Sequence, residues 1–380
     1  MASLANDLAT FKGRRVLITG HTGFKGSWLA YLLAQAGAEV TGVALPPLAE
    51  PSHFSLLQLD KHVNSRFCDI RDLAALQKEF ARAQPEVVFH LAAQAFVRKS
   101  YLDPHATFST NVLGSANVLE CVSGCKSVTT LVFVTSDKCY KNKEQQHGYV
   151  ETDELGGIDP YSVSKAAAEL VFSGYCVSAF QSADAPRVAS ARAGNVIGGG
   201  DWSPDRLIPD CVRALENNTS IEIRHPHATR PWQHVLEPLS GYVRLAVALH
   251  DGTAPTKSSW NFGPPENSVH EVHEVANVVA TRWGSPSAVR IVADPTAMHE
   301  SQLLQLNSTK ANDVLRWNIR WAFDDTMQRT VGWYRNLHDG SRAIDLTDAD
   351  VKAYLSACFT GCKLRHCKSL PTTAALCCIC

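Results

Sequence analysis

The stretch VLITGHTGFKGSWLA (residues 16–30) decides the fold, because it joins a strand pattern to a helix pattern through three glycines. The apolar run that ends at Thr19 predicts a buried parallel strand, and the apolar residues after the glycines have helical spacing. Gly20, Gly23 and Gly26 follow the pattern G-x-x-G-x-x-G. Such a loop permits a close approach of the backbone to a pyrophosphate, and the helix N-terminus offers free N–H groups. We therefore predict a dinucleotide-binding unit rather than an ordinary glycine-rich turn.

The alternation of strand and helix patterns continues to about residue 195. Predicted strands cover residues 15–19, 39–43, 63–68, 85–91, 130–135 and 188–192. Predicted helices cover residues 27–36, 73–83, 106–121 and 160–179. Strands that alternate with helices form a parallel sheet with helices on both faces. The predicted fold class is therefore α/β, with a doubly wound parallel sheet of the Rossmann type.

The pattern becomes less regular after residue 195, where we expect a smaller C-terminal α/β region. Predicted helices here cover residues 204–215, 238–250, 269–283 and 308–315, and predicted strands cover residues 221–224 and 260–263. The expected organisation is a dinucleotide-binding domain over residues 1–195 and a mainly substrate-binding region over residues 196–357. Some elements of the second region are expected to return to the first core. Residues 358–380 form a separate cysteine-rich tail.

The overall composition excludes several classes of protein. With 36 Lys and Arg against 37 Asp and Glu, the chain of 380 residues lacks the basic excess typical of a general nucleic-acid binder. Its hydrophobic content of 45% excludes disorder as the main state. No apolar run approaches the roughly 18 residues of a membrane span, and residues 1–10 lack the pattern of a signal peptide. We therefore expect a cytoplasmic protein without membrane contact.

Half of the twelve cysteines lie in the tail over residues 358–380. We expect this tail to be an appended, poorly ordered segment. The alternatives are a zinc site on Cys358, Cys362 and Cys367, or lipidation at the last four residues, which fit the C-a-a-X form. No metal site is expected elsewhere, because the histidines lack close partner ligands.

Tyr161 and Lys165 form the first candidate catalytic pair. They stand at positions i and i+4 of the predicted helix over residues 160–179, so they share one helix face. A phenol has an ordinary pKa of about 10, and a nearby ammonium and a positively charged nicotinamide both favour the phenolate. Tyr161 would then remove a proton from a hydroxyl while a hydride leaves for the cofactor. The alternative is a surface pair on an amphipathic helix.

Ser136, Asp137 and Lys138 follow the predicted strand over residues 130–135. In doubly wound sheets, ligands lie beyond the carboxyl ends of the strands. Ser136 would hydrogen-bond the reacting hydroxyl there. Asp137 and Lys138 would act as proton donor and proton acceptor in a partly dry cleft. The alternative is a solvated pair of charges at a strand end.

The position that commonly recognises the cofactor ribose carries no acid in this chain. Residues 43–47 read VALPP, without an acid for a 2′-hydroxyl or an arginine for a 2′-phosphate. This position therefore leaves NAD and NADP open. Asp69, after the predicted third strand, is expected to contact the adenine. Its alternative role is at the start of the following helix.

Several stretches of the chain match a known family pattern. They include TGHTGFKGSWL (19–29), FHLAAQAFVRKSY (89–101), VTSDKCYKNKE (134–144), GGIDPYSVSKAAAELV (156–171), ARAGNVIGGGDW (191–202) and RPWQHVLEPLSGY (230–242). On these residues the chain resembles the extended short-chain dehydrogenase/reductase family, from about residue 12 to about residue 355. Three of the stretches, TSDKCY, RAGNVIGGGDW and RPWQHVLEPLSGY, are similar to the branch of 4,6-dehydratases that acts on CDP-glucose.

The resemblance implies a hydro-lyase with NAD as cofactor and CDP-glucose as substrate. Tyr161, helped by Lys165 and Ser136, would deprotonate the hydroxyl at sugar carbon 4 while NAD accepts the hydride. The new ketone acidifies the proton at carbon 5, water is eliminated across carbons 5 and 6, and the hydride returns to carbon 6. Related thymidine-sugar dehydratases use an Asp–Glu pair for the elimination. Asp137 matches the acid, but Lys138 stands where Glu would be, so the base stays open.

The resemblance also assigns binding residues and an assembly. Residues expected at the cofactor are Gly20, Thr22, Gly23, Phe24, Gly26, Asp69, Ile70, Leu91, Ala92, Ala93, Asn111, Thr135, Tyr161 and Lys165. Residues expected at the substrate are Gln94, Asn195, Arg206 and Arg230. A homodimer is expected, paired through the predicted helices over residues 106–121 and 160–179.

Two other classes of function stay open at this point. One is a nucleotide-sugar 4-epimerase or another nucleotide-hexose 4,6-dehydratase; an epimerase needs the Tyr–Lys pair but no elimination acid. The other is a protein that binds NAD or a nucleotide sugar without turnover. The intact Tyr161, Lys165 and glycine loop argue against the second class.

Overall fold

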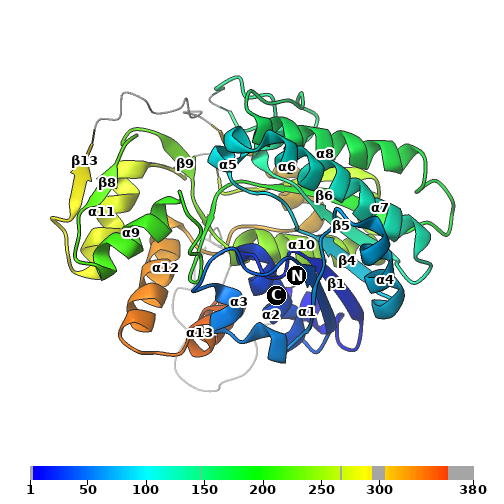
Figure 1. Cartoon of the computed structure of the whole chain (residues 1–380), viewed down its shortest axis with the longest axis horizontal. Helices are drawn as coiled ribbons and strands as arrows, with labels where there is room; N and C mark the ends of the chain where they lie inside the picture. Colours follow the sequence, from blue (N-terminus) through cyan, green and yellow to red (C-terminus); the bar gives the residue numbers. More distant parts are fainter. Residues whose placement is uncertain (1–2, 146, 266–267, 293–303, 358–380) are drawn as a thin grey trace, which may run out of the picture.

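A parallel sheet of seven strands forms the centre of the larger part of the molecule, on the right in Figure 1. The structure is a computed structural model, and it describes residues 3–145, 147–265, 268–292 and 304–357. Within these residues the strand order is β11-β6-β5-β4-β1-β2-β3, and every neighbouring pair is parallel. The strands are β1 (Arg15–Thr19), β2 (Glu39–Ala44), β3 (Asn64–Phe67), β4 (Val87–His90), β5 (Thr130–Val134), β6 (Arg187–Ala193) and β11 (Ser258–Phe262). The order runs outward in both directions from β1 and β4, which confirms the predicted doubly wound fold class.

Helices cover both faces of this sheet, because successive side chains of each strand point to opposite sides. In β1, Leu17 belongs to one buried core, whereas Val16 and Ile18 belong to the other. The helices on the Leu17 side are α4 (Leu73–Ala83), α7 (Ser115–Gly124) and α8 (Pro160–Val177). The helices on the other side are α1 (Leu4–Ala9), α2 (Phe24–Gln35) and α10 (Leu236–His250). Helix α10 and strand β11 thus bring later parts of the chain into the first core, while the domain boundaries at 195 and 357 stay predictions.

The remaining elements form a smaller α/β region, on the left in Figure 1. Its helices are α9 (Leu207–Glu216), α11 (Val272–Trp283), α12 (Phe323–His338) and α13 (Ala343–Ser356). Its short strand pairs are β8 (Ile221–Ile223) with β13 (Val289–Ile291) and β9 (Thr229–Pro231) with β12 (Val269–Glu271). A third pair, β7 (Val196–Ile197) with β10 (Gln233–His234), joins the two parts of the molecule near the glycine loop.

The predicted helix over residues 269–283 is wrong at its start. Residues Val269–Glu271 form β12, which pairs with β9 in antiparallel register, and the helix begins at Val272. The pairing with a strand almost forty residues earlier satisfies the backbone groups of β12. This long-range contact overrides the local helical spacing of the apolar residues.

The predicted helix over residues 106–121 is interrupted. Helix α6 (Pro104–Phe108) is followed by a π-helical turn over Ser109–Gly114, and only then by α7. A Cβ on Gly114 would lie 2.7 Å from Cδ1 of Ile70, so glycine allows the turn to pack against the loop after β3. The last predicted helix, over residues 308–315, also contains a π-helical turn. Helices that the sequence did not predict are α1, α3 (His53–Leu56), α5 (Val97–Leu102), α12 and α13.

No helix within the described part of the chain is long and apolar enough to cross a membrane. The predictions about the cysteine-rich tail, including its possible zinc ligands, concern residues 358–380, which lie outside the described residues.

Candidate active site

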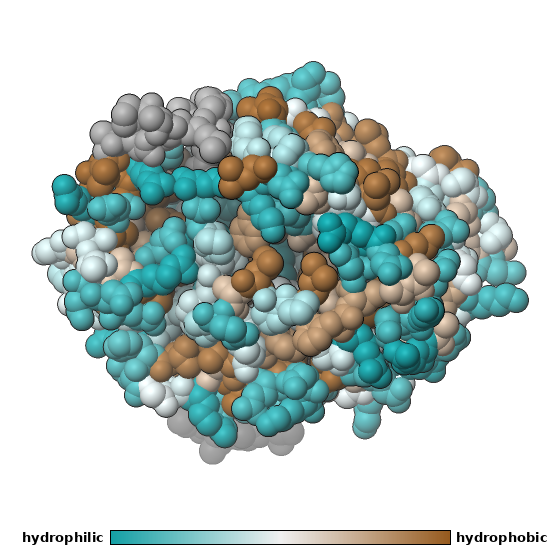
Figure 2. All heavy atoms as spheres, viewed as in Figure 1, coloured by the Kyte–Doolittle hydropathy of each residue, from teal (hydrophilic) through white to brown (hydrophobic). Residues whose placement is uncertain are grey.

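A cleft of about 1300 Å³ lies where the carboxyl ends of the parallel strands face the smaller α/β region. Figure 2 shows the surface hollowed near the middle of this view. One wall comes from the loops after β1, β4 and β5, and the other comes from segments between residues 193 and 232. Pockets for drug-sized ligands have roughly 300–1000 Å³. The cleft is therefore larger than a pocket for one drug-sized ligand.

The geometry of the loop after β1 explains why each of the three positions in its G-x-x-G-x-x-G spacing is a glycine. Gly20 has a φ angle of +82°, and a Cβ there would lie 2.7 Å from the backbone nitrogen of Ala92. A Cβ on Gly26 would lie 2.0 Å from the carbonyl oxygen of Gly20. Gly23 is the N-cap of α2 and provides no side-chain cap, so the first N–H groups of the helix remain available. This cradle fits the diphosphate of NAD, because such N–H groups and the helix dipole bind phosphate.

Asp69 and Ile70 line the same cleft beyond the end of β3. The Arg71 side chain forms a fork with Asp69, with an Nη2–Oδ2 distance of 2.6 Å. This hydrogen bond lowers the pKa of Asp69, so the carboxylate is charged and fixed in direction. Nearby, the Thr22 hydroxyl donates to the carbonyl of Leu45 at 2.8 Å. Contact of Asp69 with the adenine stays a prediction.

Tyr161 and Lys165 lie in the first turns of α8, where they are buried at the cleft. Lys165 Nζ lies 5.9 Å from the centre of the Tyr161 ring. Asp159 caps this helix by accepting a hydrogen bond from the Ser162 N–H at 2.9 Å. Burial raises the pKa of Tyr161 to about 12, against the effect of a hydrogen bond with Ser136. The predicted lowering of this pKa also involves the positive charge of the nicotinamide, so it stays a prediction.

Lys165 shows the complementary effect. Burial lowers the pKa of its ammonium to about 8, although the nearby Glu169 carboxylate opposes this. A buried cation with a lowered pKa readily gives or takes a proton near neutral pH. Tyr161 and Lys165 therefore suit proton transfer once a positively charged cofactor lies in the cleft.

Ser136, Asp137 and Lys138 stand where β5 ends. Ser136 Oγ donates to Asp137 Oδ1 at 2.8 Å and accepts from the Lys138 N–H at 3.2 Å. Asp137 is buried, and this burial raises the pKa of its carboxyl, while Lys138 and the Ser136 hydrogen bond oppose the rise. Lys138 is half-buried and also lines the cleft. A carboxyl with a raised pKa can keep a proton to donate, so Asp137 suits the role of an acid.

Asn111 lies behind the cleft wall and not on it. Its Nδ2 donates to the Gln94 carbonyl at 3.0 Å and to Ser164 Oγ at 2.9 Å, and its Oδ1 accepts from the Gln94 N–H at 2.8 Å. Asn111 thus ties the loop after β4 to α8 next to Lys165. A contact of Asn111 with the cofactor stays a prediction. Gln94 lines the cleft, but its side chain amide bonds Phe96 and Thr107 and thus holds the same loop.

Asn195, Arg206 and Arg230 line the opposite wall. Arg206 Nη1 lies 3.3 Å from Asp201 Oδ2, and its guanidinium lies 5.8 Å from the centre of the Phe96 ring. Two guanidinium groups on one wall suit a diphosphate, because the planar fork of arginine matches phosphate oxygens. Apart from Asn111, every residue predicted for catalysis, cofactor or substrate lines this one cleft.

Comparison with known proteins identifies the family of this chain. Residues 17–330 match the family model described as GDP-mannose 4,6 dehydratase. The chain belongs to this family. A CDP-glucose 4,6-dehydratase from Salmonella typhimurium is 44% identical over 351 residues, which cover 91% of this chain and 98% of that protein. A UDP-glucose 4-epimerase from Mycoplasma genitalium is 24% identical over 339 residues, which cover 86% of this chain and 97% of that protein.

A solved member of this dehydratase group has the same architecture. The structure of a dTDP-glucose 4,6-dehydratase double mutant from Streptomyces venezuelae, with NAD bound, matches with a TM-score of 0.73 and 26% identity. The match covers 84% of this chain and 97% of that chain. The resemblance to 4,6-dehydratases that we drew from the sequence is therefore confirmed.

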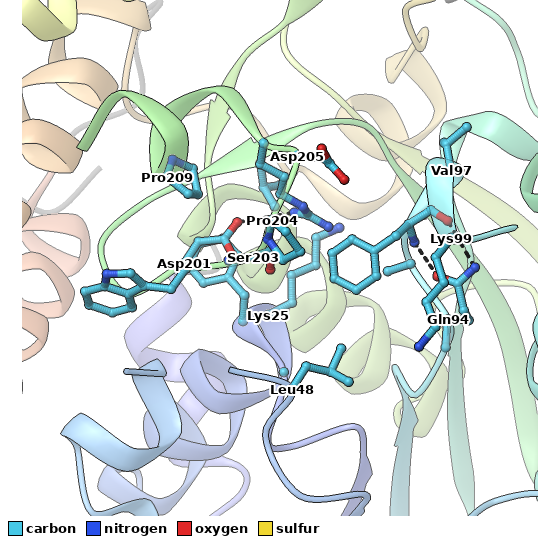
Figure 3. A pocket seen from close by; sticks show the side chains of 18 of the residues that line it. Lys25, Leu48, Gln94, Val97, Lys99, Asp201, Ser203, Pro204, Asp205 and Pro209 are labelled. Atoms are coloured by element: carbon cyan, nitrogen blue, oxygen red, sulfur yellow. Dashed lines mark hydrogen bonds and ion pairs between the residues drawn. The ribbon is translucent and has the colours of Figure 1, made fainter. Parts of the chain in front are cut away.

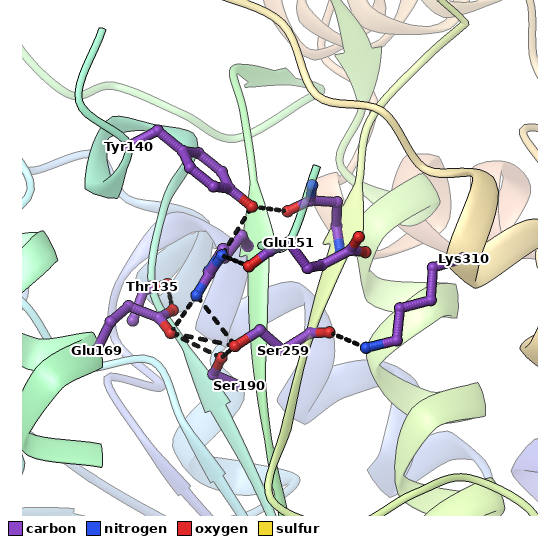
Figure 4. A network of polar contacts seen from close by, with 9 residues as sticks. Thr135, Tyr140, Glu151, Glu169, Ser190, Ser259 and Lys310 are labelled. Carbon is purple, nitrogen blue, oxygen red and sulfur yellow. Dashed lines mark hydrogen bonds and ion pairs between the residues drawn. The ribbon is translucent and has the colours of Figure 1, made fainter. Parts of the chain in front are cut away.

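A buried polar network lies beside the end of β5 (Figure 4). Arg192 Nη2 lies 2.8 Å from Glu169 Oε2, and both side chains are almost fully buried. Glu169, one turn after Lys165, also accepts hydrogen bonds from Thr135 and Ser190. Burial opposes ionisation, yet Arg192 holds the pKa of Glu169 below its ordinary value. The network thus ties α8 to β6 and to the end of β5 beside Ser136.

Replacement of Arg192 by methionine should lower the free energy of unfolding by about 3 to 5 kcal/mol, because the charge of Glu169 would stay buried without its partner. Denaturant-induced unfolding measures this loss. The control is Arg82→Met, which removes an exposed partner of Glu79 and should cost less than about 1 kcal/mol. A loss at Arg192→Met no larger than that of the control would show that the buried pair does not hold these elements together.

Two residues of the site were not recognised from the sequence. Lys25 stands inside the glycine loop and lines the cleft. Lys25 could have been recognised because it is a basic residue in the first turn of a predicted helix, where a positive charge is unfavourable. Glu169 follows Tyr161 and Lys165 at the same spacing of four residues, which placed it on their helix face.

Proposed function

We propose that this chain dehydrates CDP-glucose to CDP-4-keto-6-deoxy-D-glucose, with NAD as its cofactor. The observation that carries the proposal is the convergence of Tyr161, Lys165, Ser136 and Asp137 in one cleft beside the glycine loop. The identity of 44% over nearly the full length of a CDP-glucose 4,6-dehydratase supports the choice of nucleotide. NAD held on the glycine loop supplies a hydride acceptor for carbon 4 and later the hydride for carbon 6.

Tyr161 takes the first proton. Its phenol is buried and hydrogen-bonded to Ser136, so its raised pKa keeps it protonated until positive charge enters the cleft. Lys165 and the cofactor then favour the phenolate, which accepts the proton of the sugar 4-hydroxyl as carbon 4 loses its hydride. Ser136 orients that hydroxyl from the end of β5.

Asp137 donates a proton in the elimination. The ketone at carbon 4 acidifies the proton on carbon 5, and a base in the cleft removes it. Asp137 protonates the hydroxyl on carbon 6, which leaves as water. Lys138, next to Asp137 at the cleft, is our candidate base. Return of a hydride to carbon 6 and a proton to carbon 5 completes the product.

The substrate diphosphate is assigned to the wall that carries Asn195, Arg206 and Arg230. Charge-assisted hydrogen bonds from arginine to phosphate are strong and directional. This wall faces the glycine loop across the cleft, so a sugar held between them would lie near Tyr161 and Asp137.

A product assay with three nucleotides tests the function. Purified protein is incubated with CDP-, dTDP- or UDP-glucose, each with and without added NAD, and products are identified by mass and NMR. Loss of one water from CDP-glucose alone is the expected result. Loss of water from another nucleotide sugar would indicate a different 4,6-dehydratase, and a product of unchanged mass with inverted carbon 4 would indicate an epimerase. Binding without any product would support a non-enzymatic protein.

We infer that the chain forms a homodimer through α8 and the π-helical turn. Val163, Leu170 and Val177 stand seven residues apart on one face of α8, and they are 39%, 62% and 73% exposed. Leu113, in the adjacent π-helical turn, is 63% exposed. An apolar stripe of this kind on a soluble domain marks an interaction surface, and a second copy would supply the matching stripe. The expected cytoplasmic location stays a prediction.

Replacement of Leu170 by glutamate should convert the dimer to a monomer, because it places a charge in the centre of the stripe. Size-exclusion chromatography with light scattering measures the mass. The matched control is Ile291→Glu, because Ile291 is 57% exposed on β13, away from α8. A monomeric wild-type protein, or a Leu170→Glu variant that stays dimeric, would exclude this surface.

A further inference from the structure

We propose that Lys25 is a diphosphate ligand of the cleft, acting together with the backbone N–H groups of the glycine loop; this inference rests on the proposed function. Lys25 is the second residue of α2 and lines the cleft. Figure 3 shows its side chain extending from the start of α2 into the pocket, toward the segment that carries Asp201, Ser203 and Pro204. It thus stands between the cofactor-binding loop and the substrate wall.

The position of Lys25 is unfavourable unless an anion arrives. The N-terminus of a helix carries a partial positive charge, which disfavours a cation in the first turn. Helix α2 has no acidic residue in its first turn and no side-chain cap that would offset this charge. The ammonium of Lys25 therefore adds a positive charge to the partial positive charge at the start of α2, and both favour the binding of phosphate at the glycine loop.

Lys25 has no hydrogen bond or ion pair with any residue that the structure describes. The charged groups that face it are Arg206 from the substrate wall, Lys165 from α8 and Asp137 from the end of β5. Two of these three are cations. Burial, together with these cations, lowers the pKa of the Lys25 ammonium to about 8. An ammonium in such surroundings gains most from a ligand that brings negative charge.

The chemistry of this ligand is that of a diphosphate. Lysine binds phosphate as a point charge with three donors, and both ligands of the proposed reaction carry a diphosphate. The dinucleotide would approach Lys25 from the glycine loop, and the nucleotide sugar would approach it from the side of Arg206. Binding measurements with one ligand at a time separate these two sources.

Calorimetric titration of NAD alone and of CDP alone into the full-length protein tests the proposal. Lys25→Met should weaken the binding of at least one of the two ligands by about 10- to 100-fold, the usual range for a lost hydrogen bond to a charged group. A loss for NAD alone assigns Lys25 to the cofactor diphosphate, and a loss for CDP alone assigns it to the substrate diphosphate. Affinities within about twofold of wild type for both ligands would overturn the proposal.

Two further variants separate charge from structure. Lys25→Arg keeps the positive charge and should retain most of the affinity, whereas Lys78→Met, on the exposed face of α4, should leave both affinities unchanged. Equal losses in Lys25→Met and Lys25→Arg would mean that the side chain acts through packing, which would also overturn the proposal. Because no turnover is needed, these titrations stay valid if the dehydratase reaction itself is not found.

The pH dependence gives a second readout. Lys25 loses its proton as the pH rises through about 8, so the affinity of the wild type for the diphosphate ligand should fall there. Lys25→Arg stays charged at that pH and should lose less affinity. Lys165, which titrates in the same range, and Asp137 and Arg206 are present in both proteins, so the difference reports on Lys25. The same pH dependence in both proteins would contradict the proposal.

Discussion

Replacement of Tyr161 by phenylalanine should lower kcat by about 10²- to 10⁴-fold, the range in which positioned acids and bases contribute. The change removes one hydroxyl from a buried ring beside Ser136 and leaves the packing of α8 in place. Without the phenolate, the proton of the substrate 4-hydroxyl has no positioned acceptor, so the first oxidation is slowed. Steady-state formation of the dehydrated product measures the loss.

The control for this variant is Tyr175→Phe. Tyr175 lies on the same helix, and its hydroxyl donates to Glu120 at 3.0 Å, outside the cleft. Its loss should leave kcat within about twofold of wild type, since it touches no reacting group. Turnover by Tyr161→Phe at the rate of this control would remove Tyr161 from the mechanism.

Replacement of Asp137 by asparagine should lower the rate of dehydration by a similar factor, about 10²- to 10⁴-fold, but at a later step. The amide cannot protonate the hydroxyl that leaves carbon 6. The oxidation at carbon 4 uses Tyr161 and is not blocked. We therefore expect the near-ultraviolet absorbance of reduced nicotinamide to rise after CDP-glucose is added, while little product forms.

This spectroscopic signature separates the two variants. Tyr161→Phe should show neither reduced nicotinamide nor product, whereas Asp137→Asn should show the first without the second. The same result separates a dehydratase from an epimerase, because an epimerase needs no elimination acid. Full dehydration by Asp137→Asn would mean that another group protonates the leaving hydroxyl.

The central sheet was predictable because its signals are local. The strand before Gly20, the helix after Gly26 and the alternation that follows are all set by apolar periodicity over short windows. The positions of the candidate catalytic residues followed from the same reasoning. In a parallel sheet, Ser136 at the end of one strand and Tyr161 at the start of the next helix must meet at one edge.

Features that depend on distant contacts were not predictable in this way. The π-helical turn over Ser109–Gly114 directs Asn111 toward the loop after β4, and no local pattern marks such a turn. Strand β12 exists because β9 lies beside it. The raised pKa of Tyr161 depends on how completely the folded protein buries the phenol, which the spacing of Tyr161 and Lys165 does not show.

The central claim is an internal hydride transfer that ends in the loss of water, and an isotope experiment tests it most directly. CDP-glucose that carries deuterium at carbon 4 is incubated with the protein and unlabelled NAD in ordinary water, and the product is analysed by mass spectrometry and NMR. The account predicts a product that has lost one water and carries the deuterium on carbon 6. A product that has lost the deuterium to the solvent, or that has kept all its oxygen atoms, would contradict the account.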